Sequence, residues 1–166
     1  ALAGITEPTE IIVVVNGAPP AVYATLQQRH PRVRWQFHGP ALGFGGALAR
    51  GLAAVRFGAV YLHNSDMAIE PDALALLLTW RQPQVFAVAS QIFFDDPSKR
   101  REETGWGDLR FESDRACLFD RTPEAGFQVR GALYAGGGSS LFDTTLLRRF
   151  AALTQGYAPF YWEDAD

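Results

Sequence analysis

Cysteine, lysine and methionine are nearly absent from this chain of 166 residues, which contains one of each. The single cysteine, Cys117, has no second thiol with which to form a disulfide inside the chain, and this favours a reducing compartment, the cytoplasm. The other basic residues are arginines spread along the chain, and the net charge is -3. Because surfaces that bind nucleic acids concentrate positive charge, DNA and RNA are disfavoured as partners.

Long apolar runs are missing as well. The strongest runs, Ile11–Val15 and Ala73–Leu78, are far shorter than the roughly 18 residues that a membrane-spanning helix needs. The first nine residues include Glu7 and Pro8 but no basic group, so we expect no signal peptide. Apolar residues still make up 48% of the chain. That content supports the core of one globular domain over residues 1–166.

Apolar segments of two kinds alternate along the chain and predict an α/β fold. Short runs such as Ile11–Val15 are typical of buried strands, whereas longer segments with apolar residues three and four apart are typical of helices. Residues 95–114 are charged with little periodicity, which predicts a surface loop. The predicted strands are 11–15, 33–37, 59–62, 85–94, 127–134 and 139–142, and the predicted helices are 21–28, 47–56, 69–80 and 144–153. This order favours a mainly parallel sheet.

Asn64, Ser65 and Asp66 follow the predicted strand at 59–62, and ligands of open α/β sheets bind at the carboxyl ends of strands. A carboxylate in that place suits Mg²⁺ or Mn²⁺ held against a diphosphate, because these cations prefer oxygen ligands. The alternative is a plain turn in which Asp66 bonds to nearby backbone amides.

Three carboxylates end the chain in the segment Trp162-Glu163-Asp164-Ala165-Asp166. Carboxylates this close repel one another when ionised, which raises a pKa toward the range that suits a general base. The alternative is the acidic first turn of a helix.

Two glycine-rich segments complete the set of motifs. Residues 42–46 (Leu-Gly-Phe-Gly-Gly) open a predicted helix but lack both the dinucleotide-binding pattern and a phosphate-loop lysine. Residues 136–140 (Gly-Gly-Gly-Ser-Ser) lack the pattern that presents a nucleophilic serine. They indicate tight backbone near a ligand or another strand.

Taken in order, the motifs resemble those of the family 2 glycosyltransferases, in particular the branch with rhamnosyl- and galactofuranosyl-type transferases. The matching segments are 11–17, 42–51, 62–74 and, together, 137–142 with 160–166. The resemblance implies a GT-A fold, a Rossmann-type three-layer α/β/α sandwich with a mainly parallel central sheet. Compared with that family, we expect the chain to lack the first strand and helix and the closing helix.

The resemblance also implies roles for individual residues. Asp66 would hold Mg²⁺ or Mn²⁺ and the diphosphate of a UDP-, dTDP- or GDP-sugar, and Asp164 would be the base that takes the proton of the acceptor hydroxyl. The donor side would include Asn16, Asn64 and Ser65. The acceptor side, for a saccharide or lipid-linked acceptor, would include Gly137, Gly138, Trp162 and Glu163. The implied activity is inverting sugar transfer in cell-surface polysaccharide synthesis, in the cytoplasm and at the inner face of the membrane.

Three positions depart from the family pattern, because Val15, Ala41 and Ala49 are apolar where the family has polar residues. They motivate a second hypothesis, a catalytically silent domain of the same fold that binds a glycan or a partner protein. A nucleotidyltransferase is a weaker alternative, because the chain has no glycine-rich phosphate loop with a lysine.

Overall fold

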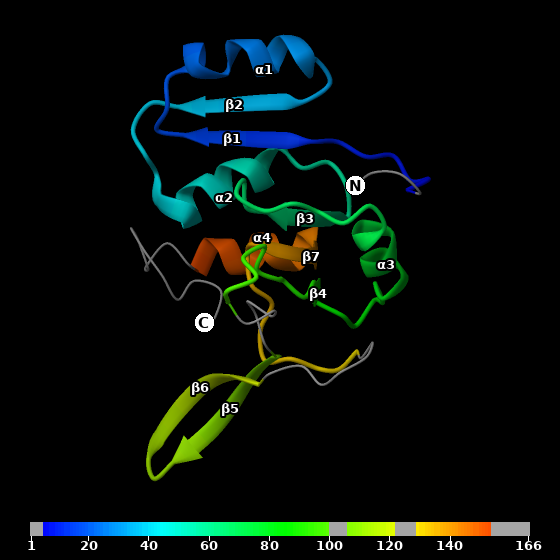
Figure 1. The fold of residues 1–166 in the computed structure, drawn as a ribbon, viewed down its shortest axis with the longest axis vertical. Coiled ribbons are helices and arrows are strands. Elements are labelled where there is room, and N and C mark those ends of the chain that lie inside the picture. Colours follow the sequence, from blue (N-terminus) through cyan, green and yellow to red (C-terminus); the bar gives the residue numbers. More distant parts are fainter. Residues whose placement is uncertain (1–4, 100–105, 122–128, 154–166) are drawn as a thin grey trace.

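The computed structural model describes residues 5–99, 106–121 and 129–153 (Figure 1). The chain is a mixed α/β protein, as the sequence predicts, and no helix within the described ranges is long and apolar enough to cross a membrane. In chain order the elements are β1 (Ile12–Asn16), the 3₁₀ helix η1 (Pro20–Tyr23), α1 (Ala24–Arg29), β2 (Arg34–His38), α2 (Gly43–Ala54), β3 (Ala59–His63), α3 (Ala73–Thr79), β4 (Ala87–Ala89), β5 (Trp106–Glu112), β6 (Arg115–Arg121), β7 (Ser139–Asp143) and α4 (Thr144–Leu153).

β1 and β2 form a parallel sheet of two strands, paired over five residues. On one face, the rings of Trp35 and Phe37 stack 6.3 Å apart, and Tyr23 of η1 lies 5.8 Å and 6.2 Å from them. On the other face lies α2, where a Cβ placed on Gly51 would be 3.3 Å from Val14 Cγ2. Glycine at this position therefore lets the helix approach the strand closely.

The second sheet has the order β3-β7-β4, and both of its pairings are antiparallel. The expectation of a mainly parallel central sheet is therefore wrong for the described residues. A parallel strand must be reached through a crossover, usually a helix, but no helix lies between β4 and β7 in the described ranges. β7 instead follows the glycine segment 136–138 and returns beside β3 in the opposite direction.

The core lies on both faces of β7. Phe142 packs with Leu52 of α2 and with Leu147 and Ala151 of α4, whereas Leu141 packs on the opposite face against α3 through Leu74 and Leu77. Side chains of adjacent strand residues point to opposite faces. β7 thus joins the two halves of the core.

β5 and β6 form an antiparallel hairpin that projects from the two sheets (Figure 1). The prediction of a surface loop over 95–114 missed it. Two other predicted strands also differ, because the strand expected at 85–94 is reduced to β4 and residues 129–134 contain no strand.

Candidate functional site

The side chain of Asn16, at the carboxyl end of β1, fixes the start of α2. Its Oδ1 accepts a hydrogen bond from the Leu42 amide at 2.7 Å, and its Nδ2 donates to the Gly43 carbonyl at 3.2 Å. Asn16 is predicted to contact the nucleotide-sugar donor, but both the oxygen and the nitrogen of its side-chain amide are hydrogen-bonded to backbone atoms. It places the first turn of α2 beside the end of the parallel sheet.

The predicted acceptor-side glycines lie next to that turn. A Cβ on Gly137 would be 2.7 Å from the ring of Phe44, so only glycine lets the ring and this backbone come so close. A Cβ on Gly138 would be 3.0 Å from Asn64 Nδ2. The backbone N–H of Asn64 donates a hydrogen bond to the Gly138 carbonyl at 2.9 Å. The structure therefore brings Asn64 together with Gly138 and connects both, through α2, to Asn16.

The turn after β3 carries the other predicted donor residues. The Met67 amide donates to the Asn64 carbonyl at 3.4 Å, and the ring Nε2 of His63 lies 3.1 Å from the Met67 carbonyl oxygen. Ser65 and Asp66 are exposed at the tip of this turn. Within the described ranges, the Asp66 carboxylate makes no hydrogen bond or ion pair, which leaves its oxygens accessible to a ligand.

A cavity of about 400 Å³ lies at the carboxyl ends of β1 and β2. Its lining residues are Gly17, Ala18, Pro19, Pro20, Phe37, His38 and Gly39. Asp66 is not among them. Sequence reasoning missed this cavity, although the signal was present, because ligand sites in parallel sheets lie where strands end.

Gly17 forms the corner of this cavity with a φ of +96°, a backbone conformation that residues with a Cβ rarely adopt. Its amide donates to the His38 carbonyl at 2.9 Å, and a Cβ at this position would lie 3.2 Å from Ala41 Cβ. We therefore expect Gly17→Ala to lower the free energy of unfolding by about 1–2 kcal/mol in urea denaturation. Gly39→Ala is the matched control, since no atom lies within 4 Å of its added Cβ. Equal losses in both variants would contradict the assigned strain.

The acidic, histidine and cysteine side chains decide whether this region could bind a metal ion. Within the described ranges, no three His, Cys, Asp or Glu residues form a group that could hold a metal ion. Mg²⁺ bound with a nucleotide commonly uses one or two carboxylates and takes further oxygens from the phosphates. The exposed carboxylate of Asp66 fits that role, whereas Trp162, Glu163 and Asp164 lie outside the described residues.

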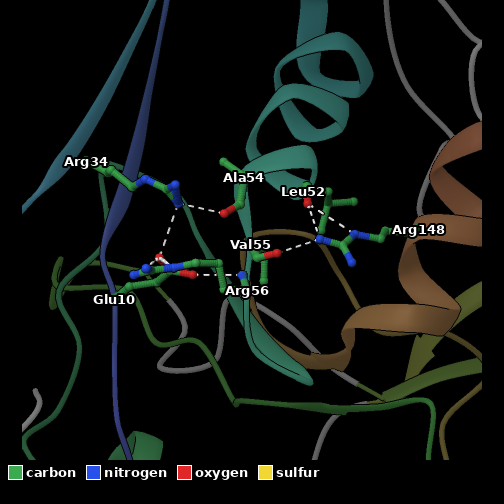
Figure 2. A network of polar contacts seen from close by, with 7 residues as sticks. All are labelled: Glu10, Arg34, Leu52, Ala54, Val55, Arg56 and Arg148. Atoms are coloured by element: carbon green, nitrogen blue, oxygen red, sulfur yellow. Dashed lines mark hydrogen bonds and ion pairs between the residues drawn. The ribbon is translucent and has the colours of Figure 1, made fainter.

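At the opposite end of the sheets, a polar network holds the last turn of α2 (Figure 2). Glu10 accepts hydrogen bonds from the Arg56 amide at 2.9 Å, from Arg56 Nε at 3.0 Å and from Arg34 at 3.2 Å. Arg34 also donates to the Ala54 carbonyl at 2.6 Å. From α4, Arg148 donates to the carbonyls of residues 52 and 55 at 2.6–3.2 Å. The network satisfies backbone acceptors that the helix end leaves open.

Both ends of α2 are thus fixed, its start by Asn16 and its end by Glu10, Arg34 and Arg148. Of the predicted site residues, Asn16 belongs to this arrangement, whereas Asn64 and Gly138 are joined to each other by the hydrogen bond from the backbone amide of Asn64. Comparison with models of protein families and with curated proteins finds no match for this chain.

Proposed function

We propose that the chain is an inverting glycosyltransferase that moves a sugar from a nucleotide-sugar donor to a saccharide or lipid-linked acceptor, with a GT-A type of fold. The observation that carries this proposal is the contact between Asn64, expected on the donor side, and Gly138, expected on the acceptor side. Sugar transfer requires the two substrates to meet in one place. Two motifs that are 74 positions apart in the sequence supply adjoining atoms at the end of β3.

On the donor side, Asn64, Ser65 and Asp66 form the turn after β3. The exposed Asp66 carboxylate would hold Mg²⁺ or Mn²⁺ together with the diphosphate of a UDP-, dTDP- or GDP-sugar. When bound, the metal ion supplies positive charge that stabilises the diphosphate as it leaves. Asn16 contributes indirectly, because its amide orients the start of α2 beside this turn.

On the acceptor side, Gly137 and Gly138 pack against Phe44 and Asn64, which places this backbone close to the turn. Trp162 and Glu163 would shape the acceptor pocket. Asp164 would take the proton from the attacking hydroxyl, on the side opposite the leaving diphosphate, as inversion at the sugar carbon requires. We place this activity in the cytoplasm, at the inner face of the membrane, where lipid-linked acceptors are found.

A second candidate function is a catalytically silent domain that binds a glycan or a partner protein. Two observations favour it. The side-chain oxygen and nitrogen of Asn16 are both hydrogen-bonded to the backbone, so they do not face a sugar donor. Asp66 does not line the cavity at the ends of β1 and β2. In that case the cavity beside Phe37 and His38 would be the binding site.

Calorimetric titration with UDP-, dTDP- and GDP-sugars in the presence of Mn²⁺ tests the proposal. One donor should bind in the presence of Mn²⁺, and Asp66→Asn should weaken that binding at least about tenfold, because it removes a negative charge next to the metal and diphosphate. Asp72→Asn is the matched control, since Asp72 is another exposed carboxylate in the same segment and caps no helix with its side chain. We expect it to bind like the unsubstituted chain.

Three outcomes decide between the candidates. Manganese-dependent binding that Asp66→Asn alone weakens supports the transferase. Binding without a metal requirement, unaffected by Asp66→Asn, contradicts the role of Asp66. No heat with any nucleotide-sugar, together with binding of a free oligosaccharide, favours the silent domain.

A further inference from the structure

The turn that carries Asp66 is closed only weakly by its own backbone. It runs from Asn64 to Met67, with Ser65 and Asp66 as its central residues. The Met67 amide donates to the Asn64 carbonyl at 3.4 Å. Backbone hydrogen bonds are most often about 2.9–3.0 Å long, so this one is long and weak. A further contact is needed if the turn is to keep a single shape.

The ring of His63, the last residue of β3, supplies that contact. Its Nε2 lies 3.1 Å from the Met67 carbonyl oxygen. A carbonyl oxygen can only accept a hydrogen bond, so Nε2 carries the hydrogen and donates it. This bond joins the residue before the turn to the residue that ends it, and it therefore limits how far the turn can open.

Two side chains keep the His63 ring in place. Tyr61 lies on the same face of β3, because residues two apart in a strand point the same way, and the two rings stack 5.9 Å apart. The Tyr61 hydroxyl shares a hydrogen bond of 2.7 Å with the Ser139 hydroxyl of β7. Tyr61 also packs against the buried cluster between β7 and α3. The ring of His63 is thus anchored to the core of the second sheet.

The start of the turn is fixed from the other side. The backbone N–H of Asn64 donates to the Gly138 carbonyl at 2.9 Å, which ties the turn to the segment that leads into β7. With its start fixed by Gly138 and its end by His63, the turn leaves little freedom to the backbone of Ser65 and Asp66. A ligand that binds the Asp66 carboxylate then has less conformational freedom to remove.

We infer that His63 is a positioning residue of the proposed donor site, whose hydrogen bond to the Met67 carbonyl keeps the turn in the shape that presents Asp66 to the metal ion and diphosphate. The inference rests on the proposed function. Residues that orient metal ligands without touching the metal typically change metal affinity about 10–100-fold when they are replaced. His63 acts in this way through the backbone of the turn and takes no part in the chemical step.

Two substitutions separate the hydrogen bond from the bulk of the ring. Glutamine carries its Nε2 the same number of bonds from Cα as histidine does, so His63→Gln keeps a donor within reach of the Met67 carbonyl. Asparagine has the same amide group on a shorter side chain, so His63→Asn loses the bond. Because His63 is exposed, neither change should alter the far-ultraviolet circular dichroism of the chain.

The acceptor of this bond can be observed directly. Met67 is the one methionine of the chain, so methionine labelled with ¹³C at its carbonyl carbon gives one NMR signal, from the acceptor itself. A carbonyl carbon whose oxygen accepts a hydrogen bond resonates at lower field than a free one. We expect the signal to move upfield in His63→Asn and to keep its position in His63→Gln.

Calorimetric titration with UDP-, dTDP- and GDP-sugars and Mn²⁺ measures the consequence for binding. His63→Asn should weaken manganese-dependent binding about tenfold, and His63→Gln by less than about twofold. Asp66→Asn separates the two measurements. It should weaken binding while the Met67 signal stays in place, because the Asp66 side chain takes no part in the bond.

Each outcome decides for or against the inference. Loss of the bond and of affinity in His63→Asn, with recovery of both in His63→Gln, supports it. A Met67 signal that is the same in all three chains overturns it, and so does a signal that moves without any loss of affinity. Equal losses of affinity in both variants overturn it as well, because the ring and not the bond would then matter.

A failure of the proposed function looks different. In that case the unsubstituted chain binds no nucleotide-sugar, while the Met67 signal still moves in His63→Asn. The role of His63 toward a donor is then overturned together with the proposed function, whereas the hydrogen bond stands.

Discussion

Phe142→Ala should lower the free energy of unfolding by about 3–5 kcal/mol, the largest loss that we expect from a single substitution. Phe142 is 4% exposed in the central strand of the second sheet, and its ring meets Phe86 edge-on at 5.5 Å. It also packs with Leu52 and Leu147. Truncation would leave a cavity where α2, α4 and the sheet meet, because three separate elements cannot all move to fill it.

Urea denaturation followed by circular dichroism measures this loss. Phe111→Ala is the control of the same residue type, since Phe111 is 72% exposed, and it should change the free energy of unfolding of the monomer by less than about 0.5 kcal/mol. A similar loss in both variants would mean that Phe142 does not lie in the core.

Glu10→Gln should lower the free energy of unfolding by about 2 kcal/mol at neutral pH. The side chain of Glu10 is 11% exposed, and its oxygens accept bonds from Arg56 and Arg34. Glutamine keeps one acceptor oxygen and turns its NH₂ toward either the Arg56 amide or the two guanidinium groups, so the donors on that side lose their acceptor. Unfolding in urea at pH 7 checks the expected loss, with Glu7→Gln, an exposed position three residues earlier, as the control.

The pH dependence of this effect has a definite sign. Burial alone raises the pKa of the Glu10 carboxyl, but the hydrogen bonds from Arg56 and the charges of Arg56 and Arg34 outweigh burial and hold the pKa below its usual 4.5. A carboxyl whose pKa is lowered by folding stabilises the folded chain above its unfolded pKa, and this contribution is lost as the pH falls through the folded value. The difference between Glu10→Gln and the unsubstituted chain should therefore shrink in acid. A difference that stays constant down to about pH 3 would exclude this linkage.

Local signals account for the parts of the fold that the sequence predicts well. α4 begins where its pattern predicts, because Asp143 caps its start by accepting a hydrogen bond from the Leu146 amide at 2.9 Å. The β5–β6 hairpin has a two-residue turn, Ser113-Asp114, in which Ser113 has a φ of 58°. Without the Asn-Gly or Asp-Gly pair that usually marks such turns, this segment resembles a loop.

Features that depend on distant segments could not be predicted in this way. The direction of β7 follows from the route of the preceding chain, and periodicity carries no information on that route. At the site, the sequence places Asn64 and Asp66 at the end of a strand, as the structure does. Nothing near Asn16 in the sequence indicates that its amide binds backbone 26 and 27 residues away.

The pairing of β7 with β3 has a consequence for the order of folding. Tyr61 and Ser139, whose hydroxyls lie 2.7 Å apart across these strands, are separated by 78 residues, whereas β1 and β2 follow each other closely in the chain. Contacts between distant segments form late, because a long loop must close first. The parallel sheet can therefore form early. Until β7 is in place, the backbone groups of β3 and β4 that pair with it have no partner. In this interval the chain is most exposed to aggregation.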